Sequence, residues 1–436
     1  MTQGSPAKNI IFFAVPLLWG NLFQQLYNVA DTLIVGNLLG NTALAAVSSS
    51  GNLVFLMVSL LSGMGMGGGV VIARFFGAGD IRNLRRAMHT AMAFGLLCGV
   101  ALTIVAPIVA PMILRLIGTP EEVLPQSITY FRLYFLGSIG SVLFNTQMGI
   151  LQSLGDSKHP VMFLAFSASL NVVLDLVFIG VFHFGVGGAA VATAITQFMS
   201  AALCFRQLLR NPPDYRLIIR EIRVRWDMMK QIMKNGIPAG MQNSIIAIAN
   251  VFVQSNINKF GEDAMAGCGS YSRIEGFAFI PIMCFTQALV TFVSQNLGAG
   301  EKDRAYRGGK IGTLIGMGTA EIIGIMVIIL APLLLGAFGG SAEAVAIGIR
   351  QARVAPAFYC LLAFSHCMAA IQRGAGRSFV PMFVMMFVWC FIRVTYISIV
   401  VRFIPRIEVV FWAYPLTWSI SSIIFLIIFL RKRWLT

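Results

Sequence analysis

Apolar stretches long enough to cross a membrane recur from one end of this chain to the other, and this constrains its fold more than any other feature. A transmembrane helix needs about 20 consecutive, mostly apolar residues. Only 11% of the 436 residues are charged, whereas an ordinary soluble protein is about one quarter charged. No long polar region remains for a separate soluble domain. The chain is therefore predicted to be an all-α polytopic membrane protein.

Glycine, proline and charged residues divide the chain into about twelve predicted helices. The predicted spans are residues 8–37, 43–74, 84–108, 121–152, 160–182, 187–210, 228–258, 264–296, 305–334, 342–373, 379–401 and 407–431. The polar stretch at residues 1–9 lacks the small-residue cleavage site of a signal peptide, so the first span is expected to be retained.

Lysine and arginine are unevenly distributed over the two sets of alternating loops. One set holds 23 of the 32 cations, and the other holds four: Arg115, Lys259, Arg402 and Arg406. Loops rich in cations stay in the cytoplasm, so both termini are predicted to be cytoplasmic and the protein to lie in the plasma membrane. The net charge of +15 then reflects orientation and contact with membrane lipid, not a nucleic-acid partner.

The two halves of the chain resemble each other at an offset of 221 residues. Residues 77–79 and 298–300 both read GAG, and Arg132 corresponds to Arg353. We therefore predict an N-terminal six-helix bundle at 1–210, a basic cytoplasmic linker at 211–227 and a C-terminal six-helix bundle at 228–436. Six spans per half give both halves the same orientation, which is typical of transporters that rock between two states.

Four polar residues are predicted to share one depth in the N-terminal bundle. Counting 1.5 Å per residue from the predicted helix ends places Asp31, Asp175 and Thr193 each about 10 Å below the outer surface. Asn171 lies one turn from Asp175 on the same helix face. Asn28 and Gln24 lie on a similar face to Asp31 and extend this network.

These oxygen and amide groups suit ion coupling. An ionised Asp at the centre of a membrane helix costs about 2.5–3.5 kcal/mol, so two acids without a basic neighbour require a reason. Paired carboxyl groups in a dry site can take up and release a proton. The same oxygens can hold Na⁺. The alternative is a structural polar cluster that holds helices together. The seven cysteines form no CxxC or CxxH motif, so no other metal site and no cofactor is predicted.

The C-terminal half does not repeat this cluster. The offset places Tyr396 opposite Asp175, and Phe252 and Val253 opposite Asp31. Glu275 and Arg273 are two residues apart and do not face each other on a helix, so each needs another partner. Glu275 either contacts a cationic substrate or pairs with Arg393, and the sequence leaves both possibilities open.

Several stretches together resemble the multidrug and toxic compound extrusion (MATE) family over essentially the whole chain. They are VPLLWGNLFQQLYNVADTLIVGNLLGNTALAAVS, ARFFGAGD with its echo SQNLGAGE, QSLGDSKHP, and LNVVLDLVFIG followed by GVGGAAVAT. The resemblance implies twelve transmembrane helices in two pseudo-symmetric bundles. It also implies a monomer that uses a cation gradient to export small lipophilic or cationic compounds.

One branch of this family carries an Asp in helix 1, an Asn and an Asp four residues apart in helix 5, and a Thr in helix 6. These match Asp31, Asn171, Asp175 and Thr193. Another branch carries an acid in helix 7, and the stretch between Lys234 and Lys259 has none. The resemblance does not settle whether H⁺ or Na⁺ is the coupling ion.

Two other functions are open to a polytopic helical protein. A lipid-linked-precursor flippase of the same superfamily would show cations lining its cleft and extra helices. A membrane-embedded enzyme would show a motif such as HExxH or GxSxG, and the sequence has neither. An exporter, and not an enzyme, is expected.

Overall fold

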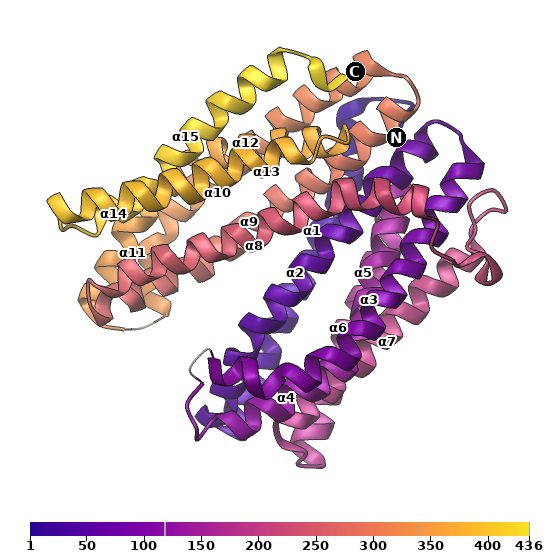
Figure 1. The fold of residues 1–436 in the computed structure, drawn as a ribbon. Helices are drawn as coiled ribbons and strands as arrows, with labels where there is room; N and C mark the ends of the chain where they lie inside the picture. Colours follow the sequence, from indigo (N-terminus) through magenta and orange to yellow (C-terminus); the bar gives the residue numbers. More distant parts are fainter. Residues whose placement is uncertain (117–118, 339, 436) are drawn as a thin grey trace. The chain divides into compact units, whose positions relative to one another are not determined.

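The computed structural model describes residues 1–116, 119–338 and 340–435, and every regular element in these ranges is helical (Figure 1). Within α2 it describes no side chains for residues 41, 44, 45 and 48–62. The first half contains α1 (Pro6–Leu39), α2 (Asn41–Gly77), α3 (Ile81–Leu116), α4 (Leu124–Leu136), α5 (Ser138–Ser153), α6 (Lys158–Asp175), η1 (Leu176–Val181) and α7 (Gly185–Arg210). After η2 (Ile219–Glu221), the second half contains α8 (Trp226–Asn258), α9 (Glu262–Gly298), α10 (Lys302–Ala337), α11 (Ala342–Val354), η3 (Pro356–Phe358), α12 (Tyr359–Gly374), α13 (Phe379–Met385), η4 (Met386–Ile392), α14 (Arg393–Phe403), α15 (Glu408–Leu430) and η5 (Arg433–Leu435).

Each of the twelve predicted spans corresponds to one helix or to a run of adjoining helices. Among the described residues, ten such segments are long and apolar enough to cross a membrane, and the bent pair α4–α5 adds an eleventh. Helix α2, with 37 residues, is the twelfth long helix. The predicted all-α, polytopic fold is confirmed.

The repeat is visible in the helix bounds. Adding 221 to the bounds of α2, α3 and α5 gives those of α9, α10 and α12. The turns that precede α2 and α9 contain Gly40 (φ 84°) and Gly261 (φ 97°), a backbone conformation that glycine adopts without strain. The two halves therefore share their turns as well as their helices.

Four predicted spans are not continuous α-helices. The span at 121–152 bends by 49° between α4 and α5, and the span at 342–373 breaks at Pro356, which has no backbone N–H. The spans at 160–182 and 379–401 contain the π-helical segments η1 and η4. Periodicity alone does not reveal these interruptions.

Helix α3 ends at Leu116, eight residues beyond its predicted end at 108, and it contains Pro107 and Pro111. Pro111 cannot donate a hydrogen bond to the carbonyl of Pro107, four residues earlier. Arg132 on α4 donates its Nε–H to that same carbonyl at 3.2 Å. The guanidinium therefore replaces the missing backbone donor, and the helix continues.

The chain forms two compact units. One consists of Met1–Leu18 and Met241–Thr436, and the other of Trp19–Gly240. In the Trp19–Gly240 unit, α3, α5 and α7 run side by side and α6 lies against α7 (Figure 1). The start of α8 belongs to this unit, where it packs on α2.

Glycines allow α2 and α8 to approach each other closely. A Cβ atom added at Gly67 would lie 2.4 Å from the backbone nitrogen of Gly236 and 2.5 Å from the carbonyl oxygen of Ile232. Such distances leave no room for a methyl group. At the neighbouring Gly68, the nearest atom would be the Cβ of Ala91 at 3.5 Å, an ordinary contact.

We therefore expect Gly67→Ala to lower the melting temperature of the purified protein in detergent, because α2 and α8 must separate. Gly68→Ala is the matched control: both substitutions raise helix propensity by about 1 kcal/mol, but only Gly67→Ala creates a clash. Equal melting temperatures for the two variants would contradict this account of the contact.

Candidate functional site

Three helices of the Trp19–Gly240 unit bring the predicted ion-coupling residues together. Asp31 lies on α1, Asn171 and Asp175 lie one turn apart on α6, and Thr193 lies on α7. Helices α6 and α7 follow each other through η1 and pack along their length. The side chains meet because these helices are neighbours, as depth counting along the sequence indicated.

Direct contacts join all four residues. The carboxyl groups of Asp31 and Asp175 lie within hydrogen-bonding distance of each other. The Asn171 amide is oriented so that both its nitrogen and its oxygen form hydrogen bonds. The nitrogen donates to Asp175 Oδ2 at 2.6 Å, and the oxygen accepts from the backbone N–H of Thr193 at 3.1 Å. The hydroxyl of Thr193 lies 3.3 Å from the hydroxyl of Tyr27. The cluster thus ties α1, α6 and α7 together.

The site is deeply buried and acidic. Asp175 is 0% exposed and Asn171 is 1% exposed, whereas Asp31 is partly exposed. Within the described ranges, neither carboxylate forms an ion pair with Lys, Arg or His. One oxygen of each, Asp31 Oδ1 and Asp175 Oδ1, is buried without a hydrogen-bond partner. Two carboxyl groups this close can share a proton, and their open oxygens can bind a small cation.

Tyrosines and apolar residues surround the cluster. Tyr130 on α4 is close enough to interact electrostatically with both Asp31 and Asp175, and its ring stacks on Tyr134 at 6.1 Å. Val35, Ile179 and Val186 pack around Tyr130. Val186 also lines a pocket of about 320 Å³ at the start of α7, together with Leu39 and Phe184.

Sequence reasoning missed Tyr27, Tyr130 and Thr196. Tyr27 lies four residues before Asp31, one helical turn away, so helical spacing alone was enough to find it. Thr196 is three residues after Thr193, and its hydroxyl oxygen lies 3.3 Å from the side-chain amide group of Asn171. Tyr130 comes from a helix without an acid, and no signal in the sequence pointed to it.

Gln24 and Asn28 form a separate polar pair on α1. Gln24 donates to Asn28 Oδ1 at 3.4 Å, and Asn28 donates to Gln25 Oε1 at 3.5 Å. Asn28 is exposed, whereas Asp31 faces α6. These bonds run along α1 and do not connect to the acid pair.

The C-terminal candidates are arranged differently. Glu275 on α9 accepts from the hydroxyl of Tyr271 at 3.5 Å, and that hydroxyl lies 2.9 Å from the Tyr359 hydroxyl. Arg393 is buried and donates twice to Thr417 Oγ1, at 2.8 and 3.2 Å. Glu275 and Arg393 interact electrostatically, but they form no direct ion pair within 4.0 Å in the part of the chain that the structure describes.

The other two C-terminal candidates do not join Glu275. Arg273 is exposed, and its guanidinium lies 5.9 Å from the centre of the Phe338 ring. Tyr396 packs against an apolar cluster that includes Ile397 and Val410. Both residues lie in the Met1–Leu18 and Met241–Thr436 unit.

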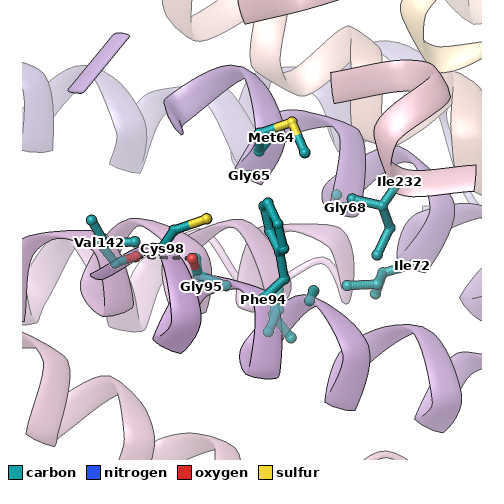
Figure 2. A pocket seen from close by; sticks show the side chains of 13 residues that line it. Met64, Gly65, Gly68, Ile72, Phe94, Gly95, Cys98, Val142 and Ile232 are labelled. Atoms are coloured by element: carbon teal, nitrogen blue, oxygen red, sulfur yellow. Dashed lines mark hydrogen bonds between the residues drawn. The ribbon is translucent and has the colours of Figure 1, made fainter. Parts of the chain in front are cut away.

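A second cavity in the Trp19–Gly240 unit lies between α2, α3, α5 and α8. Phe94 and Cys98 extend from α3 toward Met64 on α2 (Figure 2). Its volume of about 20 Å³ is little more than one water molecule needs. Thr146, which lines it, already donates to the Val142 carbonyl at 2.9 Å. The cavity therefore has neither the space nor the free polar groups of a substrate site.

The model of the MatE family matches this chain twice, at residues 16–177 and 238–399. The chain belongs to the MatE family. Each match lies in one of the two repeated halves of the chain, and together the matches cover most of the chain. Members of the family are membrane transporters, so this protein is a multi-pass membrane transporter and not an enzyme.

Relatives of this MatE transporter cover nearly all of its length. "Probable multidrug resistance protein YpnP" of Bacillus subtilis (strain 168) is 28% identical over 379 residues, which is 86% of this chain and 84% of the relative. "Probable multidrug resistance protein YoeA" of the same organism is 26% identical over 426 residues, 96% and 92% of the two chains.

Solved structures share the fold. The outward-facing conformation of a multidrug resistance MATE family transporter of the MOP superfamily superposes with a TM-score of 0.93 at 24% identity, covering 100% of this chain and 97% of that one. A MOP superfamily transporter from Pyrococcus furiosus gives the same values. The prediction of a MATE-like fold is confirmed.

The contacts of Asn171 predict a specific loss of stability. Asn171→Leu removes a donor from the fully buried Asp175 carboxylate, and a buried group left without a hydrogen bond costs about 1–3 kcal/mol. We expect a lower melting temperature in detergent. Ser169→Ala on the same helix is the control, because Ser169 is exposed and, within the described part of the chain, its side chain bonds only to the carbonyl of Ala165. An unchanged Asn171→Leu melting temperature would argue against the bridging role.

Proposed function

We propose that this MatE transporter is a cation-coupled antiporter that exports lipophilic, cationic drugs or toxic compounds by alternating access, with H⁺ or Na⁺ as the coupling ion. The observation that carries the proposal is the buried acid pair Asp31–Asp175, which forms no ion pair within the described residues. Intramembrane acids are costly, and in transporters they mark ion pathways.

The two acids have unequal surroundings, and this supports an exchange of ions. Asp175 is fully buried and is held by Asn171, whereas Asp31 is partly exposed. Asp31 is therefore the group that a proton or Na⁺ from solution can reach, and Asp175 is the fixed partner that senses the change in charge. Thr193 and Asn171 add hydroxyl and amide oxygens to a possible Na⁺ ligand set, since Na⁺, like other hard cations, prefers oxygen ligands.

The substrate class rests on composition and on the relatives. The chain has 22 Met and 34 Phe residues, side chains that adapt to varied lipophilic ligands. YpnP and YoeA are named as probable multidrug resistance proteins. Among the described residues, tyrosine hydroxyls supply the hydrogen bonds to Glu275 in the C-terminal half, and Glu275 remains the acid that we propose for contact with a cationic substrate. Arg273, over Phe338, and Tyr396, in an apolar cluster, are weaker candidates.

The flippase is the alternative to this export function. One relative, from Shewanella oneidensis, is named "FAD transporter", and FAD is an anionic dinucleotide. An anionic substrate requires cations, and the buried arginine Arg393 is already engaged by Thr417 and by the rings of Trp389 and Tyr414. Comparing an anionic with a cationic dye separates these possibilities.

We expect ethidium transport by proteoliposomes under an imposed proton or sodium gradient, and we expect Asp31→Asn to abolish the gradient-driven part. The amide keeps the size of the side chain but cannot exchange a proton or neutralise Na⁺. Asp175→Asn should be similarly impaired. Asp303→Asn, an exposed acid at the start of α10, is the matched control and should transport normally. Running both gradients identifies the coupling ion.

Full gradient-driven transport by Asp31→Asn would overturn the coupling role of this residue. Transport of an anionic dye with no transport of ethidium would favour the flippase-like alternative.

A further inference from the structure

The linker between α7 and α8 is hydrogen-bonded to the N-terminal part of α3. The backbone N–H of Ile218 donates to His89 Nε2 at 2.9 Å, and that of Arg225 donates to Thr90 Oγ1 at 3.3 Å. Arg85 donates to the carbonyl of Pro213 at 3.1 Å. Because His89 also bonds to its own helix at 2.6 Å, it holds the linker through a buried, two-ended contact.

Apolar residues of the linker determine which of its sides faces outward. Leu217 is 2% exposed and packs in the core of the Trp19–Gly240 unit, with Tyr215 and Ile222 against the same core. The ring of Tyr215 meets that of Phe76 edge-on at 5.6 Å. With these side chains buried, the linker presents its remaining residues to the surroundings as a fixed surface.

That outward surface combines large apolar side chains with cations. Ile219 is 60% exposed and Trp226 is 72% exposed. Arg216, Arg220 and Arg223 are exposed beside them, and none forms an ion pair in the described part of the chain. Of the nearby acids, Asp227 is already paired with Arg86 at 2.6 Å; Asp214 and Glu221 are the others.

The same surface continues along the first turns of α8. Trp226, Lys230 and Lys234 are all exposed and follow one another at intervals of four residues, so they share one helix face. This row is about 12 Å long. Helix α8 has 33 residues and is therefore about 50 Å long, whereas the hydrocarbon core of a bilayer is about 30 Å thick. The helix is therefore about 20 Å longer than the hydrocarbon core, and this excess is more than the length of the row.

We infer that Arg216, Ile219, Arg220, Arg223, Trp226, Lys230 and Lys234 form a binding surface for anionic phospholipid headgroups, here named the linker surface. Trp and Lys/Arg are the residues that settle at the membrane–water interface, the former through an amphipathic ring and the latter through charge. A nucleic acid or an acidic protein would match the cations but would leave Ile219 and Trp226 without an apolar environment. A lipid surface satisfies both.

The test measures lipid binding in the purified full chain, so its result does not depend on transport or on the coupling ion. Phosphatidylglycerol or phosphatidylcholine is titrated into the protein in detergent while the melting temperature is recorded. We expect phosphatidylglycerol to raise the melting temperature more than phosphatidylcholine. The quantity compared is the phosphatidylglycerol concentration that gives half of the maximal rise in melting temperature. It should be at least about tenfold higher in the triple variant Arg216→Gln, Arg220→Gln, Arg223→Gln, because each cation near an anionic surface contributes about a factor of five to binding.

The matched control removes three exposed cations elsewhere: Lys302→Gln, Arg307→Gln and Lys310→Gln, at the start of α10. It should lose much less of the response to phosphatidylglycerol than the linker variant does, because no large apolar side chain at 301–313 is exposed beside these cations. An equal loss in this control, or equal effects of the two lipids on the unchanged protein, would overturn the proposal. So would a short DNA duplex that raises the melting temperature as much as phosphatidylglycerol.

A second readout covers the case in which the triple variant folds poorly. Trp226→Ala keeps every charge and removes the exposed ring. Quenching of tryptophan fluorescence by brominated phosphatidylglycerol in vesicles should fall in this variant relative to the unchanged chain. Unchanged quenching would show that Trp226 does not reach the lipid and would refute the assignment of the surface.

Discussion

Every backbone N–H and C=O group that lies in hydrocarbon must find its partner within the protein, and the rest of this structure depends on that constraint. Continuous helices meet it automatically, but the interrupted helices do not. Where α11 gives way to α12, Glu321 on α10 accepts from the backbone N–H of Cys360 at 3.0 Å. Where α3 passes Pro111, Arg132 supplies the missing donor. At both of these places, a side chain from a neighbouring helix forms the hydrogen bond that the helix itself lacks.

The repeat shows which polar groups serve the fold and which do not. At the break between α4 and α5, Ser138 and Thr103 on α3 share a hydrogen bond of 3.0 Å, and the corresponding break in the second half uses Glu321. A polar bridge between these elements therefore recurs. The acid pair does not recur: Phe252 takes the place of Asp31, and Tyr396 that of Asp175. An architecture that needs no acid at this position in one half does not require it in the other, which is why a functional role is the stronger explanation.

The sequence was sufficient to predict the helices, the repeat and the proximity of Asp31, Asn171, Asp175 and Thr193. Apolar length, residue offset and depth can all be counted along the sequence. It was not sufficient for Tyr130, which lies on the α4 side of the bend between α4 and α5, or for the end of α3, where Arg132 compensates for a proline. Arg273 and Glu275 show the same limit. Their spacing excluded a mutual contact, but the actual partners, Phe338 and Tyr271, follow only from packing.

The two compact units meet along the chain near prolines, where the helix lacks a backbone hydrogen bond. The unit boundaries fall inside two continuous helices, after Leu18 in α1 and after Gly240 in α8, whereas the predicted boundary lies at the linker. Each boundary follows a proline by two residues: Pro16 in α1 and its repeat counterpart Pro238 in α8. Proline removes one hydrogen bond from the helix ladder, so each helix passes from one unit to the other close to its weakest point. Asp31 lies four turns beyond Pro16 on the same helix. Asp31, one member of the acid pair, thus lies on one of the two helices that belong to both units.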